Sequence, residues 1–560
     1  MICMIGLMLG LFYTSMGDHR QSMVNQALVQ ATALAEGATE QGNKELINAA
    51  AEGAPLPTGG SFTVGALKAN YTITPVGDQK IGSALEGLKS IEQMYSISAS
   101  AAIRGMHKRV EKLVNVTQVP MFQFAIFYDK DLEILPGPSL TIHGPVHSNG
   151  DMYLGAGATL SLDTDYVRAV GHVYRMRKDT KVPTDGIVDI KVYGTTKFAK
   201  MESKKGLAVP STSGFDSNFL GFDKNGDGDY FDKGDLAGWT LGALDLWKGT
   251  IRSAEHSAKD FAAPEAERIQ AYVSAPGGGD YVYDAGTNKY IEVAPGTGDY
   301  SMGVLNEAAD IRIVDGHVYK NDGTEITAWP DVNGDGNPDN PISEGTFYDA
   351  REEMYVKTTD IDIGILAQSG NWPANGLVYA MRTDATVSQP NGIRLKNGAA
   401  LAGALTVATE DPLYTWGDYN IGDAHTDQQP ASIMCDAMNV LSSKWDDTKS
   451  AGTLPHAQPT KLNVCIMTGG TPSTDGSYSG GFENLPRFHE LWTGSPAEIR
   501  GSFIYAWDSQ IAKGPWAYGG DRYQALSRDW DYWTALDDPN FMPPFTPMIS
   551  FCKRVMWLSR

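Results

Sequence analysis

Two Asp- and Gly-rich segments carry oxygen donors at the spacing of a calcium-binding loop. The first, DKNGDGDYFDKGD, has Asp or Asn at positions 1, 3 and 5 and glycine at position 6, where the chain must turn sharply. Alternating oxygen ligands of this kind converge on a hard cation. Position 12 is glycine, so an acid beside it must supply the last carboxylate. The candidate ligands are Asp223, Asn225, Asp227, Asp229, Asp232 and Asp235.

The second segment, DVNGDGNPD, repeats the opening of this pattern. Its candidate ligands are Asp331, Asn333, Asp335 and Asp339. The alternative for both segments is a solvated turn, which Asp, Asn and Gly form without any metal. We predict structural Ca²⁺ in both loops and no other cofactor.

No other group of residues indicates catalysis. Asp129, Asp131 and Glu133 alternate along one strand-like run, but they adjoin the turn sequence LPGP, so we expect them to be solvated. His143 and His147 need not share a face. Patterns of metalloproteases, serine hydrolases and nucleotide-binding loops do not occur in a fitting context. We therefore predict no catalytic residues, no carboxylate pair in a cleft, and weak glycan binding at most.

The elements that must position these residues begin with an N-terminal helix. Residues 1–17 are uncharged and nearly all apolar, and they run into an Ala-rich amphipathic pattern that continues to about residue 45. This arrangement is typical of a pilin stalk. A cleaved signal peptide and a plain membrane anchor are the alternatives. Because no Lys or Arg precedes the apolar run, we expect a basic leader upstream of Met1.

Composition sets the broad class of the protein. The chain has 560 residues, 61 Gly, 29 Pro and a net charge of -22. This acidic balance argues against nucleic-acid binding, which needs a basic face, and suits an extracellular protein. The cysteines are too few for a disulfide scaffold. We interpret Cys435 and Cys465 as small buried residues, with a disulfide between them as the alternative.

Short strand-like runs broken by Gly, Pro and Asn turns dominate the chain after residue 120. They favour a right-handed parallel β-helix with a polar insertion, and a large β-sandwich with insertions is the alternative. The predicted divisions are a pilin-like helix (1–45), a small β-rich head (46–120), the first part of the β-helix (121–174), an insertion with the calcium-like loops (175–345), the second part of the β-helix (346–515) and an aromatic C-terminal cap (516–560).

Aromatic residues cluster towards the end of the chain. We interpret them as a cap that closes the open end of the solenoid. The alternative is a surface that stacks on sugar rings or on a partner. The residues are Trp507, Trp516, Tyr518, Tyr523, Trp530, Tyr532, Trp533 and Phe541.

Four segments, together with the N-terminal helix, resemble bacterial envelope proteins that join a PilX-like type IV pilin N-terminus to a β-helical passenger. The segments are QFAIFYDKDLEILPGPSLTIHGPVHSNGDMYLG, TFYDAREEMYVKTTDIDIGIL, NGIRLKNGAALAGALTVATEDPLYTWGDYNI, and ENLPRFHELWTG with IRGSFIYAWDSQIAKGPW. The resemblance implies a minor-pilin-like surface protein exported by pilus machinery. It brings no catalytic residues with it.

The expected function is that of a non-enzymatic minor-pilin-like component or adhesin of a type IV pilus-like assembly. Its expected partners are other pilin subunits, through the N-terminal helix, and a surface or glycan ligand. We expect it in the bacterial cell envelope, anchored in the inner membrane before assembly and then in a pilus or at the cell surface. The alternatives are a β-helix polysaccharide lyase or hydrolase and a structural filament subunit.

Overall fold

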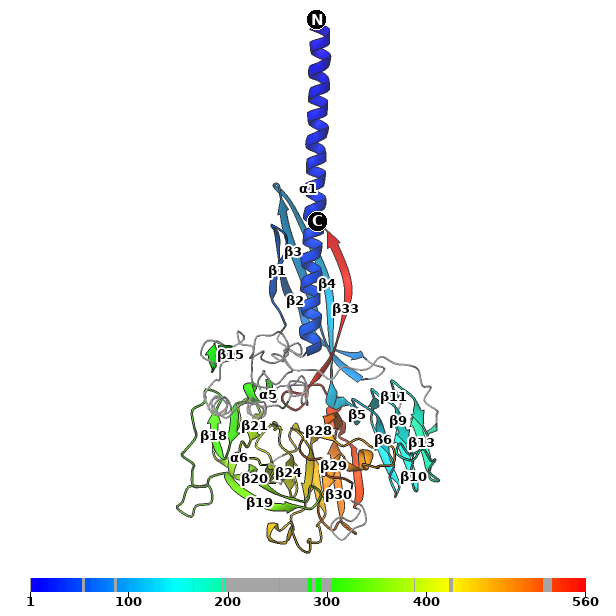
Figure 1. The fold of residues 1–560 in the computed structure, drawn as a ribbon, viewed down its shortest axis with the longest axis vertical. Coiled ribbons are helices and arrows are strands. Elements are labelled where there is room, and N and C mark those ends of the chain that lie inside the picture. Colours follow the sequence, from blue (N-terminus) through cyan, green and yellow to red (C-terminus); the bar gives the residue numbers. More distant parts are fainter. Residues whose placement is uncertain are drawn as a thin grey trace. The chain divides into compact units, whose positions relative to one another are not determined.

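The protein is mainly β, with one long N-terminal helix (Figure 1). The computed structural model describes residues 2–52, 56–84, 88–164, 166–192, 195–196, 251, 280–284, 289–293, 304–386, 388–422, 427–516 and 526–559. The chain divides into two compact units. The first unit comprises Met1–Val119 and Met548–Arg560, and the second comprises Pro120–Pro547. The last strand of the chain thus belongs to the first unit, in contrast to the predicted division at 516–560.

The first unit is a helix on a five-stranded sheet. Its elements are α1 (Ile2–Glu52), β1 (Gly59–Val64), β2 (Leu67–Ala84), β3 (Leu88–Ile103), β4 (Met106–Pro120) and β33 (Met548–Ser559). The sheet has the order β1-β2-β3-β4-β33, and the first four strands pair antiparallel. The predicted N-terminal helix is confirmed, and it continues to Glu52.

The C-terminal half of α1 packs on this sheet. The residues that it buries there lie on one stripe: Ala27, Ala31, Leu34, Ala35, Ala38 and Leu46. Most of them are alanine, so the helix backbone can approach the strands closely. At Gly42 the approach is close enough that a Cβ atom built on it would lie 2.7 Å from the ring of Tyr71. The sheet face is complementary, with Ile97 and Val110 fully buried in the same core.

The second unit begins with nine short strands that visit three sheets in turn. They are β5 (Ile126–Tyr128), β6 (Leu132–Ile134), β7 (Leu140–His143), β8 (Val146–Ser148), β9 (Met152–Leu154), β10 (Thr159–Asp163), β11 (Val167–Ala169), β12 (Val173–Tyr174) and β13 (Ile187–Val192). Each strand pairs in parallel with the third strand after it: β8 lies between β5 and β11, β9 between β6 and β12, and β10 between β7 and β13. A short strand, β14 (Thr195–Thr196), closes this group antiparallel to β13.

In the later part of the second unit, which begins at β20, short strands again pass from one sheet to another and back. The strands before it are β15 (Asp280–Asp284), β16 (Lys289–Val293), β17 (Ile311–Val314), β18 (His317–Lys320) and β19 (Ile342–Asp349). It then contains β20 (Met354–Asp362), β21 (Leu377–Met381), β22 (Asn391–Lys396), β23 (Leu405–Ala408), β24 (Leu413–Trp416), β25 (Ala431–Cys435), β26 (Met438–Leu441), β27 (Thr460–Asn463), β28 (Cys465–Gly470), β29 (Pro486–Phe488), β30 (Pro496–Gly501), β31 (Phe503–Asp508) and β32 (Ser527–Tyr532). Short helices are α5 (Val304–Ala308), α6 (Ile363–Gln368), η1 (Met121–Gln123), η3 (Asp447–Lys449), η4 (Gly481–Asn484) and η5 (Thr534–Asp537).

Successive strands of this later part alternate between sheets. Parallel pairs join β21, β23, β25, β28 and β31 in one sheet and β20, β22, β24, β26 and β29 in another, while β27, β30 and β32 form a third. Most of these strands are buried on both faces. Because both faces of these strands are buried, their sequences are nearly continuous runs of apolar residues.

The two parts of the second unit meet at β5 and β31. These strands pair in parallel, with Phe503 opposite Ile126 and Tyr505 opposite Tyr128. The aromatic strand β32 lies at the same junction: it pairs with β30, and its Asp531 accepts a hydrogen bond of 2.8 Å from the backbone N–H of His143 in β7. The structure therefore places this part of the aromatic cluster between two stacks of strands, where we had expected it to cap an open end.

The close approach of α1 to its sheet predicts opposite effects for two glycine substitutions. Gly42→Ala should lower the free energy of unfolding of the first unit by about 1–3 kcal/mol, because the new methyl group overlaps the Tyr71 ring. Gly17→Ala is the matched control, since nothing lies within 4 Å of its Cβ position and alanine favours the helix. Urea unfolding followed by circular dichroism measures both. Equal stability of the two variants would contradict the packing described here.

Candidate functional site

The N-terminal half of α1 has an exposed apolar surface. Leu11, Phe12 and Met16 are 64%, 61% and 57% exposed, and Tyr13 is 73% exposed. In soluble proteins, large apolar side chains gathered in this way mark an interaction surface. Among the described residues, no helix meets the length and apolarity needed to cross a bilayer.

The second predicted calcium loop folds around its own acidic side chains. Asp331 Oδ1 accepts a hydrogen bond of 2.7 Å from Gly334 N, and its Oδ2 accepts one of 2.8 Å from Gly336 N. Asp339 Oδ2 accepts from Val332 N at 2.8 Å. Asn333 joins this set by donating from Nδ2 to Asp339 Oδ1. Asn333 thus contacts two of the other predicted ligands, Asp335 and Asp339, and the Asp331 and Asp339 carboxylates hold the turn through backbone amides.

The first predicted calcium loop, Asp223 to Asp235, lies outside the described residues. Within the described part of the chain, no group of three His, Cys, Asp or Glu side chains has the arrangement of a metal site. Calcium binding by either loop stays a prediction.

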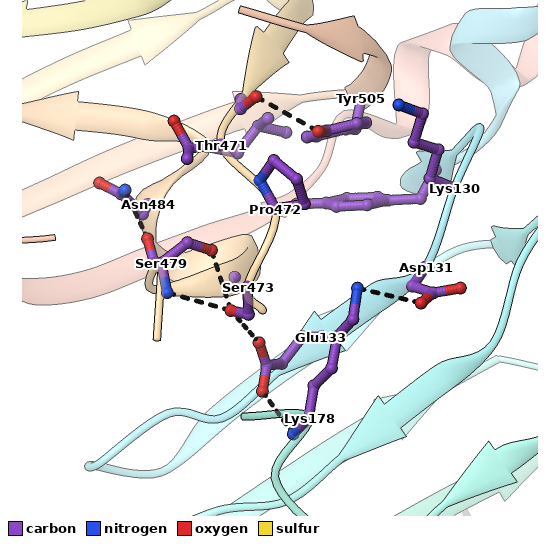
Figure 2. A pocket seen from close by; sticks show the side chains of 14 residues that line it. Lys130, Asp131, Glu133, Lys178, Thr471, Pro472, Ser473, Ser479, Asn484 and Tyr505 are labelled. Carbon is purple, nitrogen blue, oxygen red and sulfur yellow. Dashed lines mark hydrogen bonds and ion pairs between the residues drawn. The ribbon is translucent and has the colours of Figure 1, made fainter. Parts of the chain in front are cut away.

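A cavity of about 310 Å³ lies beside the junction of the two strand stacks (Figure 2). The first stack contributes Tyr128, Asp131 and Glu133 to its wall, and the second contributes Ser473 and Tyr505. Because β5 and β31 pair directly, residues that are far apart in the sequence line one space. The cavity is therefore a product of the junction.

Glu133 is the most enclosed acid of this cavity, at 3% exposure. Its Oε2 accepts a hydrogen bond of 2.6 Å from Ser473 Oγ, and its Oε1 accepts one of 2.9 Å from Lys178 N. Lys178 Nζ in turn lies 3.0 Å from Asp131 Oδ2. The expectation that Glu133 is solvated was wrong, because the segment containing Ser473 and η4 folds over the outer face of β6.

Glu483, in η4, is a second buried acid near this wall. Its Oε1 accepts a hydrogen bond of 3.0 Å from Leu135 N, directly after β6. The pKa of Glu483 is raised to about 7, chiefly by burial; the charge of Arg528 opposes this shift and the charge of Glu133 adds to it. The carboxyl group is therefore partly protonated at neutral pH.

The histidines that the sequence singled out lie in different surroundings. His143 is exposed, and its Nδ1 lies 2.6 Å from Asp531 Oδ2. His147 is buried beside Asn149, and burial lowers its pKa to about 4. The contact of His143 with Asp531 joins β7 to β32 at the junction, whereas that of His147 is local to β8.

The two cysteines of the later strands are buried and free, as predicted. They lie on the neighbouring strands β25 and β28, where Cys465 is opposite Ser432 and Cys435 is opposite Thr468. Their side chains fill space in the sheet. Burial raises the pKa of the Cys435 thiol to about 12 and so keeps it protonated.

Sequence reasoning missed most residues of the cavity. Ser473 stands in the turn-rich run GGTPSTDGSYSGG, which carries no motif. Only the alternation of Asp131 and Glu133 gave a signal, and their position beside a turn argued against it. Strand pairing between the two stacks was the missing information.

Comparison with known proteins gives weak similarity to solved structures. No protein-family model and no curated protein matches the chain. Among solved structures, the competence-associated pilin ComZ from Thermus thermophilus aligns over 95% of this chain and 97% of its own, with 10% identity and a TM-score of 0.26. A TM-score this low does not establish a shared fold.

Calcium should stabilise the chain if either acidic loop binds it. Binding to the folded state raises the melting temperature by mass action, and a chelator should remove the gain. Asp331→Ala with Asp335→Ala, in a chain that also carries Asp223→Ala and Asp227→Ala, should abolish the shift. Asp475→Ala, at a residue 87% exposed and outside both loops, is the control. If calcium does not change the melting temperature of the wild type, calcium binding by these two loops is excluded.

The raised pKa of Glu483 predicts a specific pH dependence. The folded state holds this proton more tightly than the unfolded state, so its contribution to stability is present below about pH 4.5 and is lost as the pH rises through about 7. Glu483→Gln carries no charge at any pH. The difference in unfolding free energy, wild type minus variant, should therefore fall by on the order of 2–3 kcal/mol between pH 4.5 and 7.5. Urea titrations at constant ionic strength measure it, and a constant difference would refute the assignment.

Proposed function

We propose that the chain is a non-enzymatic, pilin-like component of a type IV pilus-like assembly in the bacterial cell envelope, acting as a minor-pilin-like subunit or adhesin. The observation that supports this most directly is the division of α1 into two halves. One half is buried on the antiparallel sheet, and the other presents large apolar side chains without a partner in the described part of the chain.

An exposed apolar helix needs an apolar environment. Leu11, Phe12 and Met16 would be covered either by lipid or by the helices of neighbouring subunits. We propose that the helix lies in the inner membrane before assembly and among pilin helices afterwards. The sheet of the first unit would then fix the orientation of the helix relative to the filament surface.

The second unit would serve as the displayed part. We propose that its parallel sheets are the faces of a β-helix, because successive strands visit the sheets in a repeating order and each pairs in parallel with the strand one round earlier. Side chains at equivalent positions would then recur about 4.8 Å apart along its faces.

A non-enzymatic role is supported by the state of the cavity acids. Glu133 already bonds Ser473 and the Lys178 backbone, and Asp131 pairs with the Lys178 ammonium. A polysaccharide lyase or hydrolase would need carboxyl groups available to its substrate.

The other alternative is a purely structural filament subunit. Such a subunit would have the same N-terminal helix as an adhesin and would differ from it only in binding no ligand.

Fractionation of cells that make type IV pili tests the role of the helix. Wild-type chain should be found in the membrane fraction and in sheared filaments. Leu11→Asp with Phe12→Asp should move most of it to the soluble fraction, because two charges on the apolar face disfavour burial in lipid or between helices.

Ile81→Asp provides the matched control, since Ile81 is an exposed side chain of β2, 57% accessible and away from the helix. It should fractionate as the wild type does. Recovery of the helix double variant in filaments at the wild-type level would refute the proposal.

A further inference from the structure

We infer that the end of the first unit from which α1 emerges binds the headgroups of an anionic phospholipid bilayer. The inference deepens the proposed function and rests on it, because it takes the exposed half of α1 to lie in the inner membrane before assembly. It adds a second contact with the membrane, made by the sheet. The contact comprises the β1–β2 turn with its flanking residues (63–68) and the β3–β4 turn with its flanking residues (102–109), which together we call the turn end.

Contacts of α1 show that the β1–β2 turn points towards the apolar half of the helix. The Cβ position of Gly42 lies against the ring of Tyr71 in β2, whereas that of Gly37 lies against the ring of Phe62 in β1. Tyr71 is paired with Gly60, and Phe62 is two residues nearer the turn than Gly60. The residue numbers of α1 therefore fall towards this turn.

The β3–β4 turn lies at the same end of the sheet. Because β2 and β3 pair antiparallel, with Asn70 opposite Ser100, the start of β2 lies beside the end of β3. The helix extends beyond the strands in this direction (Figure 1). Residues 11–23 of α1 are exposed, and burial on the sheet begins at Ala27. A bilayer that holds the exposed half of α1 would therefore face the turn end.

Basic residues collect at the turn end without acidic neighbours in the same segments. Residues 63–68 and 102–109 contain no Asp or Glu. The opposite end of the same strands is balanced, since residues 78–84 and 88–92 hold two acids and two bases. The Lys and Arg residues of the turn end are Lys68, Arg104, Lys108 and Arg109.

Most of these cations are available to a ligand. Arg109 Nε donates a hydrogen bond of 2.8 Å to Ser98 Oγ. Lys68 and Arg104 are exposed, and neither makes a hydrogen bond or an ion pair in the described part of the chain. Lipid phosphates accept charge-assisted hydrogen bonds from such groups.

The β1–β2 turn also presents apolar side chains beside its lysine. Val64 and Leu67 are paired across the turn and are 53% and 40% exposed. Nothing lies within 4 Å of the Cβ position of Gly65 between them, so the turn stands in open space. Apolar side chains next to a base suit the boundary between headgroups and acyl chains, where the base can reach the phosphates.

The charge of the whole chain explains why the position of these bases matters. With a net charge of -22, the chain as a whole is repelled by an anionic surface. Salt at about 0.1 M screens such forces beyond about 10 Å, so the charges at the contacting end decide the sign. On the exposed half of α1, Asp18 and Arg20 offset each other. The bases of the turn end therefore convert repulsion into attraction, by about fivefold in partition for each Lys or Arg at the surface.

The test measures binding of the full chain to sedimented vesicles of phosphatidylcholine alone and of phosphatidylcholine mixed with phosphatidylglycerol. Wild type should bind the mixed vesicles more tightly, and high salt should remove the difference. Lys68→Gln with Arg104→Gln should weaken binding to the mixed vesicles by about ten- to thirtyfold and leave binding to the neutral vesicles unchanged.

Lys44→Gln with Lys80→Gln is the matched control. Both residues are exposed, Lys44 on the C-terminal half of α1 and Lys80 in the part of β2 far from the turn end, and the net charge changes by the same amount. This variant should bind both vesicles as the wild type does.

Three results would each overturn the inference: no preference of the wild type for the mixed vesicles, equal losses in the two double variants, or no binding to either vesicle. Binding to the neutral vesicles reports on the apolar helix, and the preference for the mixed vesicles reports on the turn end. Failure of the inference is therefore distinguishable from failure of the proposed function.

Discussion

The parallel pairing of β5 with β31 is the contact on which the second unit depends. Phe503 N donates a hydrogen bond of 2.9 Å to Ala125 O, and Ser502 Oγ donates one of 2.6 Å to Phe124 O. These bonds join a strand that opens the unit to one near its close. Through this pairing a ten-stranded sheet becomes continuous, from β11 at one end to β18 at the other. The cavity, with walls from both stacks, exists only because this junction forms.

Buried polar pairs fix the register of the stacked strands. Arg394 is 1% exposed and bonds Asp360 on the neighbouring strand, at 2.8 Å from its Nε and 2.6 Å from its Nη2. Two strands further on, in β26, Asn439 Oδ1 accepts a hydrogen bond of 2.8 Å from Nε2 of His489. A slip of one residue would leave these groups buried and unpaired, at a cost of several kcal/mol for an ion. Apolar strands of this length would otherwise pair in several registers.

The sequence predicted local features well and long-range ones poorly. The helix followed from its Ala-rich stripe, because helical periodicity is a property of neighbouring residues. The short strands followed from turn residues such as Gly and Asn. The burial of Glu133 did not follow, since it depends on Ser473, which is more than three hundred positions away. The place of Trp530 at the junction depends in the same way on β7 and β30. No local pattern encodes which strands become neighbours.

The position of β33 in the sheet of the first unit has a consequence for biosynthesis. This strand lies beside β4, yet a ribosome makes it only after the whole second unit. A nascent chain arrested anywhere before residue 548 leaves the edge of β4 with unpaired backbone groups, the kind of edge that promotes aggregation. The sheet of the first unit, on which the helix packs, is therefore completed only after the strand that follows the second unit has been synthesised.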